Sequence, residues 1–181
     1  MKFIAMDVAD SKKKMLDMIA IQLQKPGFAM DRYFYRSHFT YQAELESVIF
    51  KSWLYAGHVS QVRQNGDFFL FEIGEDSLII SRDDRGQIGA MHNVCRHRGA
   101  RVCEESSGHK KAFVCPYHGW TYNTDGSLKR AREMERLDGF DCADYALKKV
   151  RLVVFEGMIF INCDMKAPDF TVPLSHIAKP L

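Results

Sequence analysis

The sequence predicts a mainly β protein, a small antiparallel β-sandwich or barrel that is preceded by an N-terminal helical lead-in. Two observations support this fold class. After Trp53, apolar runs of four to six residues alternate with Gly, Asn and Asp turn signals, which is typical of short antiparallel strands. Before Trp53, apolar residues recur with the i, i+3, i+4 spacing of helices. A chain of 181 residues can support one such core with an appendage.

The first predicted element is a helix over residues 11–24, and the Pro-Gly pair at 26–27 ends it. A second helix is predicted over residues 40–53. Leu45 and Val48 belong to its apolar stripe, which repeats at helical spacing.

Seven apolar runs then predict the strands: WLYAGHV, FFLFEI, SLIIS, IGAMHNV, AFVC, LVVF and GMIFIN. Turns are predicted between them at Asn65-Gly66, Asp84-Arg85-Gly86, Ser107-Gly108 and Asp125-Gly126. The polar segment 130–147 predicts a loop with a short helix. The predicted organisation is therefore a helical extension over residues 1–52, a β domain over 53–165 and a tail over 166–181.

The composition is that of a globular protein, with 46% hydrophobic and 27% charged residues. Lys and Arg number 25 and Asp and Glu 23, and this net charge of +2 argues against a nucleic-acid partner. The sequence shows no secretory segment and no apolar run of about 18 residues, which predicts a cytoplasmic protein with no membrane partner. The five cysteines are an odd, sparse set and predict no disulfide framework. They are Cys95, Cys103, Cys115, Cys142 and Cys163.

The most informative pattern is Cys95-Arg96-His97 followed, after seventeen residues, by a segment that begins at Cys115 and reaches His118. Each half supplies one thiolate and one imidazole near a predicted strand–turn junction. A Rieske centre is a [2Fe–2S] cluster in which two His replace two Cys on one iron. One Cys and one His from each of two loops supply that ligand set.

The charge of such a site favours easy electron uptake. Two Fe³⁺ and two S²⁻ carry +2, so two thiolates make the oxidised site neutral, whereas four would make it −2. The alternative is a structural zinc site, which two thiolates would also neutralise. Zinc fingers, however, usually group Cys with Cys and His with His, while each pair here is mixed.

These residues resemble the Rieske domain of ring-hydroxylating-type oxygenase large subunits, over about residues 28–165. The runs HNVCRHRGARVC, CPYHGWTYNTDGSL and EGMIFIN are similar to that family's pattern. In the overall character of its sequence, the chain most resembles the branch of this family that includes choline and glycine-betaine monooxygenases. The resemblance implies a small antiparallel β domain with two cluster-binding loops, in which Cys95 and Cys115 hold one iron and His97 and His118 the other.

The resemblance also implies a role in electron transfer. In this family the cluster takes electrons from a ferredoxin or reductase and passes them to a mononuclear Fe(II) in a C-terminal catalytic domain, usually in a neighbouring subunit of a homotrimer. Family large subunits are more than twice as long as this chain. The unused histidines show no facial-triad spacing, and they are His38, His58, His92, His109 and His176. We therefore expect the electron-entry part of an oxidoreductase, with no catalytic residues of its own and no hydroxylation by this chain alone.

One alternative is a stand-alone Rieske-type ferredoxin that serves a separate oxygenase. Such ferredoxins are usually shorter and lack a helical lead-in like residues 11–52. We also expect His58 and His92 to be core or strand-edge residues and His109 to be solvated.

Four further residues are candidates for the surroundings of the cluster. Trp120 and Tyr122 are expected to shield it or pack beneath it, and the Tyr117 hydroxyl is either near the site or exposed. High-potential respiratory Rieske proteins carry a hydroxyl residue where this chain has Trp120, which predicts a potential in the lower part of the Rieske range, about −150 to 0 mV. Arg98 belongs to a basic surface on which an acidic ferredoxin could dock. The members of that surface are Arg96, Arg98, Arg101, Lys110 and Lys111.

Overall fold

The computed structural model describes residues 10–134 and 136–170. The chain divides into two compact units, Met1–Ser52 and Trp53–Leu181. Within the described residues, no helix combines the length and the apolar character needed to cross a membrane.

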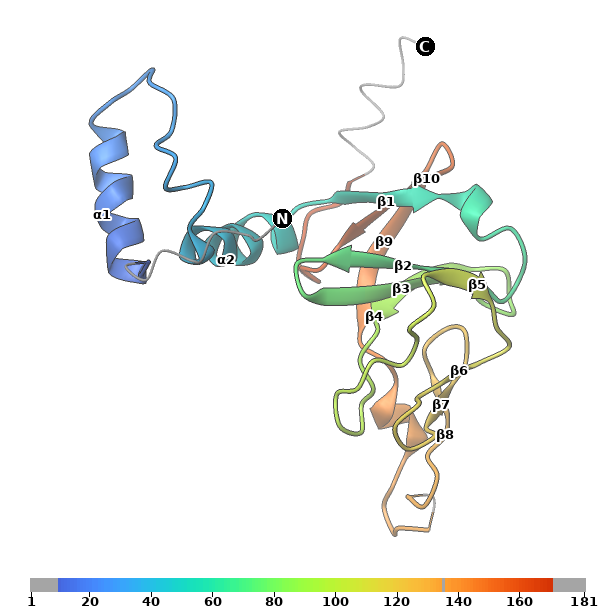
Figure 1. The fold of residues 1–181 in the computed structure, drawn as a ribbon. Coiled ribbons are helices and arrows are strands. Elements are labelled where there is room, and N and C mark those ends of the chain that lie inside the picture. The colour runs from blue at the N-terminus through green and yellow to red at the C-terminus, as the bar shows by residue number, and fades with distance from the viewer. Residues whose placement is uncertain (1–9, 135, 171–181) are drawn as a thin grey trace. The chain divides into compact units, whose positions relative to one another are not determined.

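The first unit contains the helices α1 (Lys12–Leu23) and α2 (His38–Ser47), followed by the 3₁₀ turn η1 (Ile49–Lys51) (Figure 1). Both helices begin at a serine whose side chain accepts a backbone N–H of the first turn, as helix N-caps do. The prediction of α1 is confirmed to within one residue at each end. The second helix starts two residues earlier than predicted and ends at Ser47. The backbone of Val48 leaves the helical conformation, and its side chain is 54% exposed, so the predicted stripe does not continue.

The second unit is built from two antiparallel sheets (Figure 1). The larger sheet has the strand order β1-β10-β9-β4-β3-β2-β5, and the smaller has the order β6-β7-β8. The strands of the larger sheet are β1 (Leu54–His58), β2 (Asp67–Ile73), β3 (Asp76–Arg82), β4 (Ile88–His92), β5 (Ser107–His109), β9 (Lys149–Phe155) and β10 (Met158–Asn162). Those of the smaller sheet are β6 (Phe113–Val114), β7 (Thr121–Tyr122) and β8 (Leu128–Arg130). The prediction of a mainly β, antiparallel fold is confirmed.

All seven predicted apolar runs contain a strand, but one predicted turn is wrong. Ser107-Gly108 lies in β5, where Gly108 pairs with Phe68 of β2. A three-residue strand is too short to show an alternating pattern. It forms here because it pairs with the edge of β2. Strands β7 and β8 were missed for the same reason. The short helix predicted within 130–147 is the 3₁₀ turn η3 (Cys142–Tyr145), and η2 (Val59–Gln61) follows β1.

The turn between β7 and β8 docks the smaller sheet onto the larger one. Ser81 of β3 donates its hydroxyl to the Thr124 carbonyl at 2.6 Å. Gly126 has a φ of +84°, and a Cβ there would lie 2.7 Å from the Met91 sulfur of β4. The shared core includes buried side chains from both sheets, among them Phe68 and Phe113, whose rings meet edge to face.

The predicted tail, residues 166–181, is described only as far as Phe170. Trp53 donates its indole N–H to the Pro168 carbonyl at 3.1 Å, and its ring packs on Phe170. Residues 171–181, including His176, lie outside the described residues.

Candidate metal centre

The two predicted ligand segments form two loops of the same design. The first loop follows β4, and the second connects β6 to β7. In each, the cysteine N–H donates to a carbonyl five residues ahead, from Cys95 to Ala100 and from Cys115 to Trp120, at 2.8 Å. In each, the cysteine carbonyl accepts the N–H of a glycine four residues ahead, which has a positive φ of 76° or 71°. Glycine adopts this left-handed conformation without the strain that a Cβ would bring.

The loops bring the four predicted donors together as two facing pairs. The thiols of Cys95 and Cys115 are 3% and 2% exposed. Burial and the hydrogen bond with Cys95 raise the pKa of the Cys115 thiol. The imidazole rings of His97 and His118 lie 4.7 Å apart between centroids. Across the described part of the chain, no three or more His, Cys, Asp and Glu side chains are grouped so that they could hold one metal ion. The four donors therefore form two separate pairs, one of sulfur atoms and one of imidazoles, and not a single four-donor site.

The chemistry of this donor set fits a cluster with two thiolates and two imidazoles. His97 Nδ1 is buried and has no hydrogen-bond partner among the described residues. Burial also lowers the pKa of His97, which favours the neutral imidazole with a free lone pair. A buried ring nitrogen without a partner is costly unless it binds something else. A metal ion would satisfy it.

Tyr122 contacts the sulfur pair directly. Its hydroxyl lies 3.4 Å from Cys95 Sγ and accepts the N–H of Arg96 at 3.0 Å. The side chain is fully buried, and burial raises the pKa of Tyr122, so the phenol stays protonated. With the Arg96 N–H filling its acceptor side, the phenol is directed to donate toward the sulfur.

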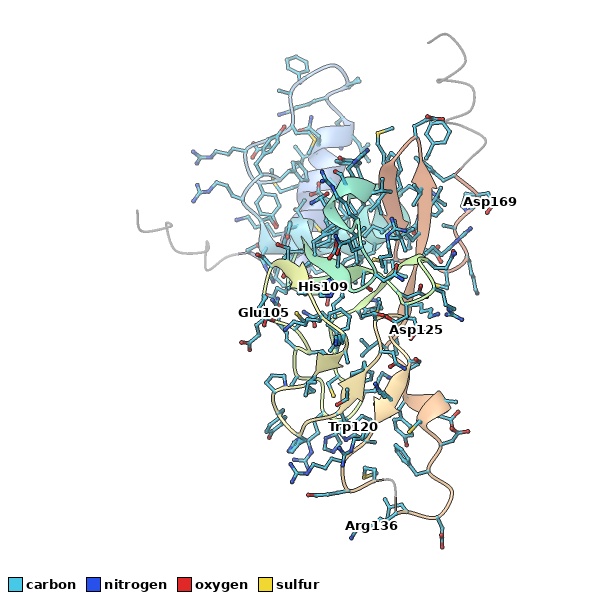
Figure 2. The ribbon with its side chains drawn as sticks, turned by 90° about the vertical axis from the view of Figure 1, so that its right-hand side faces the viewer. Glu105, His109, Trp120, Asp125, Arg136 and Asp169 are labelled. Atoms are coloured by element: carbon cyan, nitrogen blue, oxygen red, sulfur yellow. The ribbon has the colours of Figure 1, made fainter. Side chains whose placement is uncertain are left out.

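Trp120 supports the nitrogen pair. Its indole stacks on the imidazole of His97 at 5.0 Å with only 8° between the planes. Phe140 and Tyr145, whose rings stack on each other, both pack edge to face against the indole. Figure 2 shows Trp120 at the β6–β8 end of the domain, with Asp169 at the other end. The orientation of His97 is therefore fixed by packing that reaches to η3.

The imidazole pair borders a surface hollow of about 540 Å³. Its lining includes both imidazoles and Arg98, together with Tyr117, which is 58% exposed and lies 3.9 Å from His118 between ring centroids. Residues 132–134 form another wall. That wall could not be predicted from the sequence, because the segment has only the polar composition of a loop and reaches the hollow through the turn after β8.

The remaining candidates lie outside this group. Cys103 is buried, and its thiol donates to Glu105 at 3.2 Å. Burial raises the pKa of Cys103 to about 11. All five cysteines are free thiols. His109 is exposed as predicted, but its ring also hydrogen-bonds Asp67 at 3.0 Å.

Two members of the predicted basic surface are engaged in ion pairs. Arg101 binds both carboxylate oxygens of Glu72 at 3.2 Å. Lys110 lies 2.7 Å from the carboxylate of Glu105. Pairing of these two charges leaves Arg96, Arg98 and Lys111 as the exposed members of this surface outside those ion pairs, and the two arginines lie on the first loop itself.

Comparison with known proteins agrees with this geometry. The family model of the Rieske [2Fe-2S] domain matches residues 52–145. The chlorobenzene dioxygenase subunit alpha of Cupriavidus sp. (strain PS12) is 40% identical over 137 residues, which are 75% of this chain and 30% of that protein. The glycine betaine monooxygenase oxygenase subunit of Pseudomonas aeruginosa is 34% identical over 173 residues, 94% of this chain and 40% of that protein.

Solved structures show the same fold. Naphthalene 1,2-dioxygenase from Rhodococcus sp. superposes with a TM-score of 0.79 at 28% identity, over 89% of this chain and 38% of that one. The quaternary ammonium Rieske monooxygenase CntA superposes with a TM-score of 0.74 at 31% identity, over 82% of this chain and 42% of that one. The chain thus spans well under half the length of the relatives it matches.

Proposed function

Because this chain belongs to the Rieske [2Fe-2S] domain family, we propose that it relays single electrons from a donor protein to an oxygen-activating iron site outside the described residues. The observation that carries this proposal is the facing sulfur and nitrogen pairs, one member of each pair from each loop. Cys95 and Cys115 hold one iron in this proposal, and His97 and His118 hold the other. When bound, the [2Fe–2S] cluster supplies reversible uptake of one electron.

The side chains around the site have separate tasks. The buried thiols and the phenol of Tyr122 keep water from the sulfur side and provide a hydrogen bond to Cys95. Trp120 holds the ring of His97 in a fixed plane. On the nitrogen side, both imidazoles border the surface hollow, which is where a partner surface would contact them.

The partners follow from the same surfaces. The donor in this proposal is an acidic ferredoxin or a reductase, attracted by Arg96 and Arg98 of the first loop. The acceptor in this proposal is a mononuclear Fe(II) in a catalytic domain outside the described residues. The match covers only 30% and 40% of the two oxygenase subunits, which are longer than this chain. The catalytic domain belongs either to the same polypeptide or to a neighbouring subunit of a homotrimer. We also propose a cytoplasmic location, because none of the five cysteines is paired in a disulfide and reducing conditions keep them unpaired.

Two alternatives make different predictions. A stand-alone Rieske-type ferredoxin would use the same ligands, but the likeness to an oxygenase subunit extends over 94% of the chain, including the helical unit. A structural zinc module would bind one zinc ion and no iron.

The test is metal and sulfide analysis of the purified chain, with an EPR spectrum after reduction by dithionite. We expect about two iron and two sulfide per chain and a rhombic signal of low average g value. The chain alone is expected not to hydroxylate a substrate. One zinc per chain, with no cluster after anaerobic reconstitution with iron and sulfide, would refute the proposal.

A further inference from the structure

The first ligand loop is closed by a side chain and not by strand pairing. The second loop has its ends joined in the β6–β7 ladder, where Val114 pairs with Thr121. The first loop leaves β4 at His92, and the next strand, β5, pairs with β2 and not with β4. Its two ends therefore need another connection to hold Cys95 and His97 in place.

Asn93 supplies that connection. Its side chain is fully buried. Its Oδ1 accepts the N–H groups of Val102 and Cys103 at 3.0 and 2.9 Å, and its Nδ2 donates to the Cys103 carbonyl at 2.6 Å. A carboxamide carries the same donor and acceptor as a peptide group. The side chain thus takes the place of a paired strand and ties the loop's beginning to its end.

Further polar groups extend the connection to the β2–β3 hairpin. Asn93 Nδ2 also donates to the Ser77 hydroxyl at 3.2 Å, and that hydroxyl donates to Glu72 at 3.0 Å. The same carboxylate binds Arg101 of the loop. About half of the Glu72 and Arg101 side chains is exposed, so this pair contributes less than the buried amide.

We propose that Asn93 is a positioning residue that pre-forms the first ligand loop and controls how tightly and in what geometry Cys95 and His97 hold the cluster. This inference rests on the proposed function. Asn93 does not touch the thiol pair or the imidazole pair through any of these contacts. It acts through the backbone at both ends of the loop.

The test compares three variants of the full chain. Asn93→Ala removes all contacts of the amide, and Ser77→Ala removes one of them. Ser81→Ala is the matched control, because Ser81 is also a buried serine of β3 but donates to the β7–β8 turn. The measurements are the rate of cluster loss to an iron chelator at a temperature where each variant is folded, the EPR spectrum of the reduced protein, and the melting temperature.

Changes of residues that hold metal ligands in place lower metal affinity about 10-fold to 100-fold at other metal sites. We therefore expect Asn93→Ala to lose its cluster faster than the wild type by about that factor, with a broadened or shifted EPR spectrum. The rate of cluster loss of Ser77→Ala should lie between the rates of Asn93→Ala and the wild type. Ser81→Ala should lower the melting temperature without changing the spectrum or the rate.

The inference would be overturned by an Asn93→Ala protein whose rate of cluster loss and EPR spectrum match those of Ser81→Ala. If Asn93→Ala does not fold, it would be overturned by a Ser77→Ala protein whose rate and spectrum match those of Ser81→Ala. A wild-type chain that binds no [2Fe–2S] cluster would refute the proposed function itself, and the two failures are therefore distinguishable.

Discussion

Replacing Tyr122 by phenylalanine is expected to lower the reduction potential of the cluster. The change removes one hydroxyl, which lies 3.4 Å from Cys95 Sγ, and leaves the buried ring in place. On reduction the site passes from neutral to −1, so the sulfur becomes a better acceptor and the hydrogen bond stabilises the reduced state more. Hydrogen bonds to charged groups contribute about 1.5–3 kcal/mol and neutral ones about 0.5–1.5 kcal/mol, which gives a difference of about 1–1.5 kcal/mol.

That free energy converts directly into a potential. A tenfold change in an equilibrium constant is about 1.36 kcal/mol and, for one electron, about 59 mV. The Tyr122→Phe potential should therefore fall by about 45–65 mV, measured by redox titration followed by EPR. Tyr117→Phe is the control, because it removes a hydroxyl from an exposed tyrosine of the second ligand loop, and its potential should stay near that of the wild type. A Tyr122→Phe potential that is equal to or above the wild-type value would refute this reasoning.

Three further predictions concern the ligands, the packing and the response to acid. Cys95→Ser and His118→Ala should each abolish cluster assembly, whereas Cys103→Ser should retain it; an intact visible spectrum in either ligand variant would contradict the assignment. Trp120→Ala should lower the free energy of unfolding, measured by urea titration, by about 3–5 kcal/mol, because removal of a buried indole leaves a large cavity. A loss below about 1 kcal/mol would show that the stack of Trp120 on His97 is not part of the core. The hydrogen bonds of Asp67 to the Gln64 N–H and to His109 hold the pKa of Asp67 below its ordinary value of 3.8. Since that pKa is lower in the folded state, its stabilising effect is complete above about pH 4 and is lost as the pH falls through the folded-state pKa. Stability measured against pH should therefore fall less steeply below pH 4 in Asp67→Asn than in the wild type, and parallel curves would contradict this.

Much of the fold could be predicted because apolar periodicity reports long elements. Strands such as β2 and β3 bury one face or both, so their pattern is visible in the sequence. Helix α1 is visible from the spacing of its apolar residues, although Met15 is the one it buries. Strands of two or three residues, such as β5 and β7, carry no period and are decided by a partner distant in sequence. The end of α2 was missed because its cause is the backbone of Val48, which no residue pattern announces.

The donor residues of the site could be predicted, but its supports could not. Two mixed Cys and His pairs are rare and chemically specific, so spacing alone indicated a cluster. The positions of Tyr122 against Cys95 and of Trp120 on His97 depend on how two loops meet in space. Asn93 gave no signal, because a buried amide that replaces a strand looks in sequence like any polar residue at the end of a strand.

The central claim is that one iron is held by Cys95 and Cys115 and the other by His97 and His118. Pulsed EPR of the reduced chain, which detects nitrogen nuclei bound to the cluster, tests it most directly. We expect two distinct directly coordinated ¹⁴N nuclei in the wild type. A cluster with no coordinated nitrogen, or with only one, would contradict the claim.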